Sequence, residues 1–394
     1  MARPRKKRTA APKPIAFAAR APDVSVDEVL TDDDRHEFVR FPLTHYAGDQ
    51  NFVPPIVAER RDFIDAAINP YFEQARATFF IARRHGRMVG RIAAVIDSRY
   101  NRFHDTSDGF VGMFECQNDP SIAAGLFEAA ATWVRRAGMQ RLVGPVNLAF
   151  HHDCGLLIDG FDEPPAMMMA YNPRYYLRLF EANGFERLKD LYSYELEASQ
   201  GLPDKIVRLA ERVRRSDHIN VRVLNTDHPE DDIRRIRSIY ETMLRPGFGF
   251  APLTDSEMAQ IAHRLRPIVL LRPELSLIAE VDGEAVGFSV TLPDANLAQK
   301  KAEGSLFPFG LIKMLWAARH IHRLRVLLFG IRDGFRRRGI DALLALETLE
   351  RARRLGYHRG ELGWVVDDDK LMNRTIEATG ARRVKTYRIF ERPL

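Results

Sequence analysis

Cysteine is scarce in this sequence of 394 residues, which contains only Cys116 and Cys154. Neither cysteine belongs to a CxxC pair or to a spacing typical of metal ligands, so we expect neither a disulfide framework nor a bound metal. Both lie in apolar, strand-like contexts, which predicts buried thiols in a reducing cytosol. No uninterrupted apolar stretch reaches about 18 residues, so no transmembrane helix is predicted.

Acidic residues are absent from residues 1–22, which hold seven basic residues in a stretch rich in Ala and Pro. The whole chain has a net charge of +6, so residues 23–394 have a net charge of −1. We therefore expect no broad basic groove for nucleic acid on the folded part. The stretch also lacks the apolar run of a signal peptide. We predict a flexible tail that either only solvates the end of the chain or touches anionic lipid or RNA.

The sequence contains an internal repeat. Residues 79–92 and 276–289 each read as an apolar strand, a tight turn with glycine and a return strand, which is typical of a β-hairpin. Residues 181–185 and 377–381 are similar at almost the same separation in the chain. Two independent matches of this kind indicate a tandem duplication, and a chain of this length is able to form two hydrophobic cores.

Both copies have the same order of predicted elements: a helical region, the hairpin, a strand, a helix, a strand, a short helix and a last strand. The segments after the hairpins are predicted at 109–116 and 325–331 (strands), 122–137 and 340–355 (helices), 141–146 and 361–366 (strands), and 192–196 and 387–391 (last strands). This order predicts an α/β fold of the α+β type, with a mixed, mostly antiparallel sheet flanked by helices in each copy. We place the domains at 23–200 and 201–394, after the 1–22 tail.

A basic turn follows an apolar strand of the second copy. The strand, 326–331, leads into Arg336-Arg337-Arg338-Gly339-Ile340-Asp341-Ala342, which opens a helix. Glycine allows a ligand to approach the backbone, the helix N-terminus presents free N–H groups, and arginine binds phosphate in a bidentate manner. Three arginines at a helix N-terminus oppose the helix dipole, which favours a bound anion over a helix start that binds nothing. The turn therefore predicts a site for a phosphate-bearing cosubstrate.

This segment resembles the Arg/Gln-x-x-Gly-x-Gly/Ala pyrophosphate signature of the GNAT acyltransferases. Arg336 stands at its first position and Gly339 at its central glycine, whereas Asp341 takes the last position and Ala342 follows. The resemblance covers about 278–394 and implies that acyl-CoA binds here as cosubstrate. The implied acyl-CoA contacts are Leu328, Phe329, Gly330, Ile331, Arg336, Arg337, Arg338, Gly339, Ile340, Asp341, Ala342 and Asn373.

The corresponding part of the first copy lacks this chemistry. After its strand, Phe110–Phe114, the sequence reads Asn118-Asp119-Pro120, which caps a helix with an acidic residue instead of arginines. We therefore predict that the first copy does not hold CoA and contributes to the acceptor side.

The first copy instead contains a run rich in Gly, Pro and polar residues between 144 and 176, where a strand should lead into a helix. Its methionines and tyrosines are typical of an adaptable apolar pocket, although core packing with a satisfied histidine pair explains them as well. From this run and one strand of the second copy we select candidate substrate-binding residues: Asn147, Asp153, Met168, Tyr171, Asn172, Tyr175 and Trp364.

Several segments together resemble a family of bacterial tandem-GNAT proteins that includes the bacterial ceramide synthases. The matching segments are 153–161, 171–173, 306–310 and 338–343, and in this family Asp341 is an ordinary variation. The resemblance implies transfer of a fatty acyl group from acyl-CoA to the amine of a long-chain base, in sphingolipid biosynthesis.

Such a transfer needs a base, because the amine must lose a proton before it attacks the thioester. In many GNAT enzymes a tyrosine in the last helix acts as the general acid. The corresponding residues here, Thr375-Ile376-Glu377, include no tyrosine. The candidate bases are Glu361, Asp367 or its neighbour Asp368, and His151 or His152 from the first copy. A histidine in this role would place the active site between the copies.

Residues 306–318 form an apolar segment that is followed by basic residues. Such a segment either lies at a membrane interface or faces the core. We expect a cytoplasmic protein. If the segment lies at a membrane interface, we also expect peripheral binding to the cytoplasmic face of the inner membrane. The alternatives are a small-molecule acetyltransferase that uses acetyl-CoA, an aminoacyl-tRNA-dependent ligase, which would need a basic face, and a binding protein without catalysis.

Overall fold

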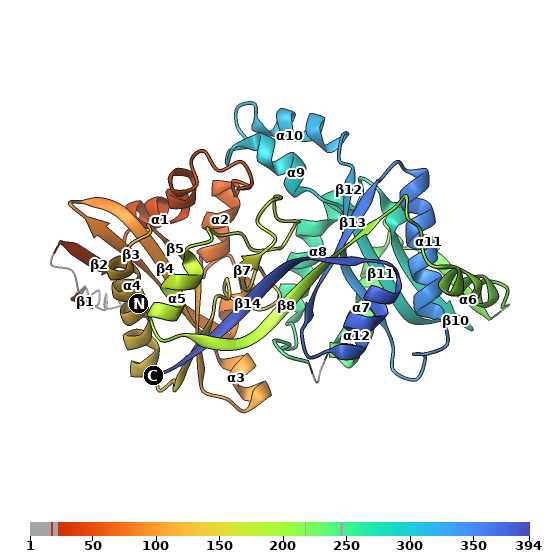
Figure 1. Ribbon diagram of the computed structural model, residues 1–394, viewed down its shortest axis with the longest axis horizontal. Coiled ribbons are helices and arrows are strands. Elements are labelled where there is room, and N and C mark those ends of the chain that lie inside the picture. Colours follow the sequence, from red (N-terminus) through yellow and green to blue (C-terminus); the bar gives the residue numbers. More distant parts are fainter. Residues whose placement is uncertain (1–16, 19–22, 217, 245–246) are drawn as a thin grey trace, which may run out of the picture.

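The computed structural model describes residues 17–18, 23–216, 218–244 and 247–394. Its strands are β1 Phe17–Ala18, β2 Val24–Glu28, β3 Ala75–Arg84, β4 Arg87–Asp97, β5 Asp108–Cys116, β6 Arg141–Gly144, β7 Leu156–Asp159, β8 Glu186–Glu197, β9 Ile219–Val223, β10 Ser276–Val281, β11 Glu284–Pro293, β12 Arg323–Ile331, β13 Arg359–Val366 and β14 Arg382–Pro393. They form one sheet through the molecule in the order β1-β2-β3-β4-β5-β6-β14-β8-β13-β12-β11-β10-β9, and β7 pairs with β14 beside this row (Figure 1).

Helices cover both faces of this sheet (Figure 1). The α-helices are α1 Asp32–His45, α2 Val57–Ile64, α3 Ser98–His104, α4 Pro120–Arg136, α5 Tyr176–Ala182, α6 Asp204–Arg214, α7 Pro229–Leu244, α8 Asp255–Val269, α9 Asn296–Gln299, α10 Gly310–Ala318, α11 Ile340–Arg354 and α12 Lys370–Ala378, and the short 3₁₀ helices are η1 Pro70–Glu73, η2 Pro273–Leu275 and η3 Lys300–Ala302.

Strand pairing confirms the predicted sheet type. Most neighbouring strands are antiparallel, whereas β5 pairs with β6 and β12 pairs with β13 in parallel. A long helix, α4 or α11, connects the strands of each parallel pair, so both copies have the predicted order of elements. The strand predicted over 141–146 ends earlier, at Gly144, and both last strands are longer than predicted.

The last strands of the two copies are exchanged. β8, the last strand of the first copy, pairs with β13 of the second copy, and β14, the last strand of the second, pairs with β6 of the first. β8 and β14 also pair with each other along most of their length. The two copies therefore share one sheet, and the domain boundary predicted at position 200 does not separate it into two sheets.

Both predicted hairpin turns are present and have the same backbone conformation. His85 and Gly86 have φ angles of 50° and 75°, and Asp282 and Gly283 have φ angles of 50° and 81°. Positive φ at both central residues is typical of two-residue turns whose twist matches that of the strands they join. The repeat therefore extends from the sequence to the local geometry.

The first copy packs apolar side chains on both faces of its strands. One cluster lies under α4 and α5, where the rings of Phe114, Phe127 and Phe180 contact one another. The other lies under α1 and α2 and contains residues of the exchanged strand β14. Cys116 and Cys154 are buried and unpaired, as predicted, and burial raises the pKa of both thiols.

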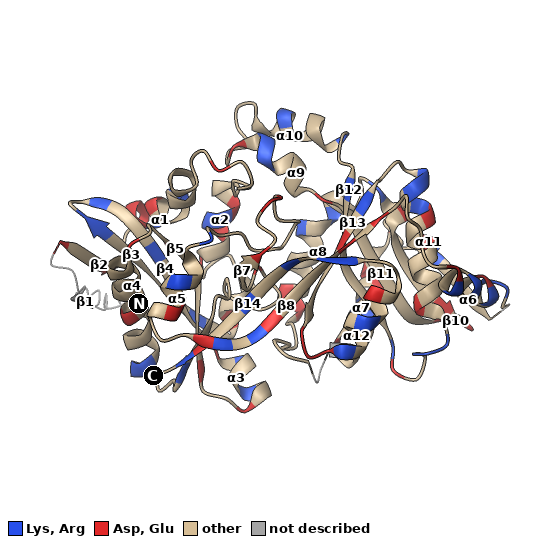
Figure 2. Cartoon of the chain, in the orientation of Figure 1, with Lys and Arg blue, Asp and Glu red and all other residues tan. Residues whose placement is uncertain are grey.

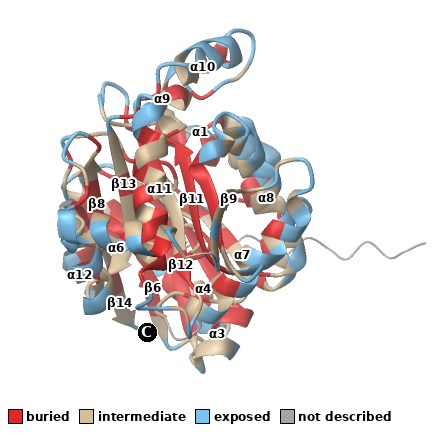
Figure 3. Ribbon diagram, turned by 90° about the vertical axis from the view of Figure 1, so that its right-hand side faces the viewer, coloured by how far each residue is buried: buried red, intermediate tan, exposed pale blue. Residues whose placement is uncertain are grey.

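A projection formed by α9, α10 and their connection exposes large apolar side chains. Phe307 is 86% exposed, Phe309 66%, Ile312 64% and Trp316 63%. Figure 3 shows α10 beyond the body of the molecule and largely exposed. The large apolar side chains of 306–318 are thus exposed, whereas Met314, Ala317 and Ala318 pack against a buried cluster of the second copy.

Most of the predicted tail lies outside the described residues, including all seven of its basic side chains. Phe17 and Ala18 are described, and they pair with Val26 and Ser25 of β2. No helix in the described ranges is long and apolar enough to cross a membrane. Figure 2 shows Lys and Arg interspersed with Asp and Glu over both copies.

Candidate active site

The strands β12 and β13 separate halfway along their length. Their parallel register extends only as far as Val326 and Leu362. β12 has a bulge at Leu327, where its register with β11 shifts. Among the described residues, Leu327–Ile331 therefore have no strand partner on the β13 side, and we call this divergence of the two strands the cleft.

Side chains along this separation are mainly apolar and only half-buried. Leu328 and Phe329 lie on β12, and Trp364 lies on β13. Gly330 is buried, and a Cβ atom at this position would lie 2.7 Å from Sδ of Met243. Ile331 is also buried and packs in the cluster under α11. The four predicted acyl-CoA contacts on β12 thus lie at the cleft. Leu328 and Phe329 are half-buried, whereas Gly330 and Ile331 are buried against the core.

The basic turn lies beyond the end of β12 and presents its arginines to solvent. Arg336, Arg337 and Arg338 are all exposed. Arg336 Nε lies 3.1 Å from a carboxylate oxygen of Asp333, and the Arg338 guanidinium lies 4.8 Å from the centre of the Phe335 ring. These contacts keep two of the arginines beside the turn with polar atoms available to an anion.

The helix that follows the turn has no side-chain cap among the described residues. Gly339 stands at the N-cap with a φ of 79°, and Ile340 and Ala342 are buried and fix the start of α11, with the half-buried Asp341 between them. A Cβ atom on Gly339 would lie 2.9 Å from Val213 of α6. The free N–H groups at this helix start are a general site for anions.

A tyrosine from the first copy reaches the last helix of the second copy. Tyr194 on β8 donates a hydrogen bond of 2.7 Å to Oδ1 of Asn373 on α12. The Asn373 amide group donates to the carbonyl oxygens of Val366 and Asp369, both at 2.8 Å. Asn373 therefore ties α12 to the end of β13, and Tyr194 ties both to β8. Sequence reasoning missed Tyr194 because the strand exchange has no signature in the sequence.

In the first copy, the chain itself fills the corresponding cleft. The amide of Val146 donates to the Val111 carbonyl at 2.7 Å, and the side-chain oxygen of Asn147 accepts from the Met113 amide at 2.7 Å. At the start of α4, a carboxylate oxygen of Asp119 accepts from the Ser121 amide at 2.8 Å. The strand edge and the helix start have no such partner in the described part of the second copy, and both are occupied in the first.

Most candidate substrate-binding residues of the first copy have partners within their own copy. Asp153 forms an ion pair of 3.0 Å with Arg60, and Tyr171 donates to Asp49 at 2.8 Å. Asn172 is buried and bonds both backbone groups of Leu157. Tyr175 donates to the carbonyl of Cys116 at 2.6 Å. These contacts, together with that of Asn147, fix the loop and do not converge on the cleft of the second copy.

Met168 lies at the contact between the copies. It packs against a cluster that contains Met167 of the same loop and Ile239, Phe288, Val290 and Leu292 of the second copy, and Leu327 and Leu328 also pack against this cluster. Trp364 packs against the core of the first copy from β13. Met168 and Trp364 are therefore the two substrate candidates that join the first copy to the cleft.

Among the candidate bases, Glu361 lies nearest to the point where β12 and β13 separate, one position before Leu362. It is 1% exposed. One carboxylate oxygen accepts from the Ser193 hydroxyl at 2.7 Å. The other lies 3.6 Å from the Lys385 ammonium and 3.9 Å from Arg323, and it accepts no hydrogen bond in the described part of the chain.

The other candidate bases are engaged elsewhere. Burial lowers the pKa of His151 to about 4 and that of His152 well below its usual value. The two imidazoles lie against each other, and the ring of Tyr71 packs against both. Asp367 pairs with Arg187 and Asp368 with Lys189. The described residues contain no cluster of His, Cys, Asp and Glu able to hold a metal ion.

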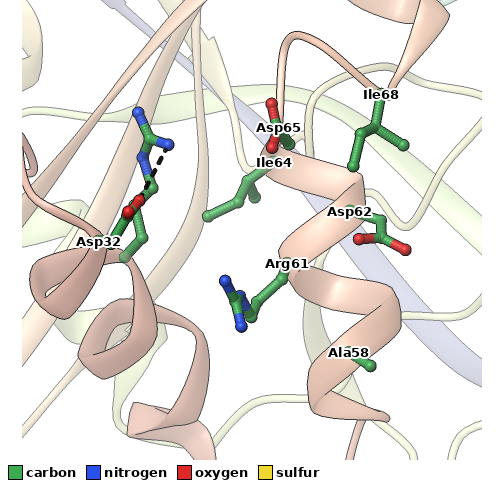
Figure 4. Close-up of a pocket in the computed structure, with 8 residues that line it drawn as sticks. Asp32, Ala58, Arg61, Asp62, Ile64, Asp65 and Ile68 are labelled. Atoms are coloured by element: carbon green, nitrogen blue, oxygen red, sulfur yellow. Dashed lines mark ion pairs between the residues drawn. The ribbon is translucent and has the colours of Figure 1, made fainter.

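Two surface pockets lie in the first copy, away from these groups. One, of about 290 Å³, lies between α1 and α2, and Figure 4 shows its charged lining, with Asp32, Arg61, Asp62 and Asp65. The other, of about 440 Å³, is lined by residues such as His45, Asn118 and Tyr175. Tyr175 is the one predicted site residue that lines either of these two pockets.

Comparison with solved structures supports the same fold. A tandem GNAT protein from the clavulanic acid biosynthesis pathway superimposes with a TM-score of 0.56 at 12% identity and covers 94% of this chain and 98% of its own. A GCN5-related N-acetyltransferase from Sphaerobacter thermophilus gives a TM-score of 0.53 at 15% identity, with 95% and 96% covered. These similarities establish the tandem GNAT fold.

Two curated proteins are similar over nearly their whole length, although no family model matches the chain. The protein named Bacterial ceramide synthase from Caulobacter vibrioides is 32% identical over 387 residues, which is 96% of this chain and all of that protein. Protein YghO from Escherichia coli is 30% identical over 93% of this chain and 94% of its own. The chain belongs to the family of the bacterial ceramide synthase, with the tandem GNAT fold, and is an N-acyltransferase.

Proposed function

We propose that the protein transfers a fatty acyl group from acyl-CoA to the amine of a long-chain base, as in sphingolipid biosynthesis. The observation that carries this proposal is the cleft between β12 and β13, which leads to an uncapped helix start beside three exposed arginines. The name of the Caulobacter relative supports the choice of acceptor.

On the donor side, we assign the pyrophosphate of CoA to Arg336–Ala342 and its pantetheine arm to the edge of β12 at Leu328–Ile331. Free strand amides at this edge would bind the arm and polarise the thioester carbonyl. The contacts of Asn373 with β13 support a role in holding the cleft open rather than in binding phosphate directly. In the first copy the same edge is filled by Val146 and Asn147, which supports a single donor site.

On the acceptor side, we assign residues 23–200 a supporting role and residues 201–394 the reaction itself. Met168 and its apolar neighbours extend from Leu327 and Leu328 into the molecule, which suits a long hydrocarbon chain. Trp364 covers the opposite side of the cleft. Asn147, Asp153, Tyr171, Asn172 and Tyr175 would act by fixing the loop that carries Met168, since their polar groups are bonded within the first copy.

For the base we favour Glu361, because its second carboxylate oxygen has no hydrogen-bond donor and it lies next to the cleft. His151 and His152 are weaker candidates, since the two imidazoles pack against each other and against Tyr71 in the first copy. Asp367 is weaker too, because it hydrogen-bonds directly with Arg187, whereas the Lys385 and Arg323 cations lie 3.6 Å and 3.9 Å from the second carboxylate oxygen of Glu361.

We further propose that the α9–α10 projection binds the surface of a membrane, from which both substrates are collected. Phe307, Phe309, Ile312 and Trp316 would enter the apolar layer, and the exposed Lys313 and Arg319 would face anionic headgroups. Each basic residue near an anionic surface contributes on the order of 1 kcal/mol. The basic tail 1–22 would add to this attraction, and we assign the protein to the cytoplasmic face of the inner membrane.

The decisive experiment is a transfer assay with purified protein. Acyl-CoA donors of two to eighteen carbons (about the natural range of acyl-chain lengths) are offered with a long-chain amine, with short polar amines and with no amine. Thiol release and product mass are measured. We expect release that depends on the long-chain amine and rises with donor length. Acetyl-CoA used as readily as palmitoyl-CoA would favour the small-molecule acetyltransferase, and no thiol release with any pair would overturn the proposal.

A further inference from the structure

A cluster of buried polar groups lies at the base of the cleft, on the sheet face that meets the first copy. Arg325 of β12 and Glu361 of β13 are direct neighbours in the parallel register, one position before the strands separate. Tyr387 belongs to the exchanged strand β14. The three residues are 2%, 1% and 0% exposed. They influence one another electrostatically, because both Glu361 and Arg325 act on the ionisation of Tyr387.

Several polar atoms of this cluster have no hydrogen-bond partner in the described part of the chain. They are Nε and Nη1 of Arg325, the second carboxylate oxygen of Glu361 and the hydroxyl of Tyr387. The remaining groups are used, since Arg325 Nη2 donates to the carbonyl of Gly363 and Glu361 accepts from Ser193. A buried polar group without a partner lowers the stability of the folded state. Such a concentration on three different strands is therefore unfavourable for stability alone.

The first-copy loop covers the cluster on one side. Arg323 donates to the carbonyl oxygens of Pro164 and Pro165, and the Met167 amide donates to Asp294, so the first-copy loop covers this face. Met169 of the same loop lies 3.2 Å from Arg325. Gly363, to which Arg325 donates, stands where β13 turns away from β12.

We propose that Arg325 and Tyr387 select the acceptor by binding an oxygen atom next to its amine, while Glu361 binds the amine itself. The atoms without a hydrogen bond comprise two guanidinium donors, a hydroxyl and a carboxylate oxygen, which lies 3.6 Å from the Lys385 ammonium and 3.9 Å from Arg323. We match them with an amine beside a hydroxyl. This assignment rests on the proposed function and adds two specificity residues to it. Tyr387 is supplied by the exchanged strand, so the exchange completes the site.

The transfer step balances as follows. Glu361 accepts one proton from the acceptor ammonium, and the amine nitrogen then attacks the thioester carbonyl carbon. The new C–N bond forms as the C–S bond breaks, and sulfur leaves with the electron pair. The second N–H proton is lost as the amide forms and is taken up by the thiolate, and the proton on Glu361 returns to solvent.

The test compares two acceptors of equal chain length, a 2-amino-1-alkanol and the corresponding alkylamine, in the parent protein and in Tyr387→Phe. A site with buried hydrogen-bonding groups discriminates strongly against a ligand that leaves them unpaired. We expect the parent protein to prefer the amino alcohol in kcat/KM by at least about tenfold. Tyr387→Phe should lose most of this preference, mainly through a lower kcat/KM for the amino alcohol.

Tyr357→Phe serves as the matched control, because Tyr357 is buried in a different cluster of the second copy. Equal use of both acceptors by the parent, or an unchanged preference in Tyr387→Phe, overturns the assignment. If neither amine is acylated, the proposed function fails. The affinity of the protein for each amine is then measured by calorimetry without acyl-CoA, and this measurement tests the role of Tyr387. Tighter binding of the amino alcohol that Tyr387→Phe abolishes supports it, and equal binding overturns it.

Discussion

Tyr194 and Asn373 come from different copies of the repeat, and a hydrogen bond of 2.7 Å joins the tyrosine hydroxyl to the asparagine side chain. The bond links the exchanged strand β8 to α12, which borders the cleft. Burial raises the pKa of Tyr194 to about 12, so the hydroxyl keeps its proton at neutral pH and remains a donor. The geometry of the cleft in the second copy thus depends on a residue of the first.

Replacement of Tyr194 by phenylalanine should loosen this border. The change leaves Oδ1 of Asn373 without its donor, and the loss of one such bond costs about 1 kcal/mol. We expect a small decrease in unfolding free energy and a higher KM for acyl-CoA in steady-state assays. Since the folded pKa is raised, the parent protein should lose this contribution between about pH 10 and 12 in urea titrations, whereas the variant should not. An unchanged KM would separate Tyr194 from the donor site.

The arginines of the turn should act on donor affinity. Each charge-assisted hydrogen bond to phosphate contributes about 1.5–3 kcal/mol, so Arg336→Ala and Arg338→Ala should each raise the KM for acyl-CoA by about 10–100-fold. Arg136→Ala is the matched control, because Arg136 is an exposed arginine on α4, the helix of the first copy that corresponds to α11. Equal KM values in all three variants would contradict the assignment of the turn.

Gly339 should be sensitive for a structural reason in addition to ligand binding. Its φ is 79°, and an added Cβ would press against Val213 and Leu209 of α6. Gly339→Ala should therefore lower the unfolding free energy by about 1–3 kcal/mol. In Gly334→Ala, with a φ of 87° and no atom within 4 Å of the added Cβ, only the backbone strain remains. A difference between the two variants in chemical denaturation measures the contact with α6. The turn is thus sterically constrained, so a larger side chain at this position would disturb the fold as well as the bound anion.

His151 should make the protein less stable in weak acid. Burial lowers its pKa to about 4 from an ordinary value of 6.5, so the unfolded state binds a proton more readily. The stability that this group contributes is full above pH 6.5 and is lost as the pH falls towards 4, by up to about 3 kcal/mol. His151→Gln should flatten this decrease in urea titrations. His36→Gln, at an exposed position of α1, should keep the slope of the parent, and an equal slope in all three proteins would contradict the prediction.

The α9–α10 projection should determine membrane affinity. Phe307→Glu and Trp316→Glu place charges at side chains that are 86% and 63% exposed, so the fold should tolerate both. We expect the double variant to lose sedimentation with anionic vesicles at low salt while it keeps the melting temperature of the parent. Ile68→Glu, at a position that is 52% exposed elsewhere, should bind vesicles as the parent does. Retained binding in the double variant would remove this surface from the proposal.

The fold was largely accessible from the sequence because its signals are local. The turns at His85-Gly86 and Asp282-Gly283, the cap at Asp119 and the apolar spacing of α11 each depend on residues a few positions apart. The same applies to the turn at Arg336–Ala342. Whether 306–318 is buried or exposed could not be predicted from the sequence, since the exposure of an apolar segment depends on which distant parts of the chain pack against it.

The strand exchange and the residues that depend on it could not be predicted. Pairing of β14 with β6 joins residues about 250 positions apart, and no propensity or periodicity distinguishes it from pairing within one copy. For this reason Tyr194 and Tyr387 were not candidates. The separation of β12 from β13 could not be predicted either, because the sequence of both segments is that of ordinary apolar strands. The contact by which Asn147 fills the equivalent place in the first copy has no sequence signal.

The exchanged strands also have a consequence for synthesis of the chain. A ribosome releases the first copy long before it has made β14, yet β6, which pairs with β5 on one side, has β14 as its neighbour on the other. One strand edge of the first copy therefore has no partner until translation ends, and an unpaired strand edge is able to pair with other chains. Expression of residues 1–200 alone would make this transient state permanent, so the repeat unit of the sequence is not a unit of folding.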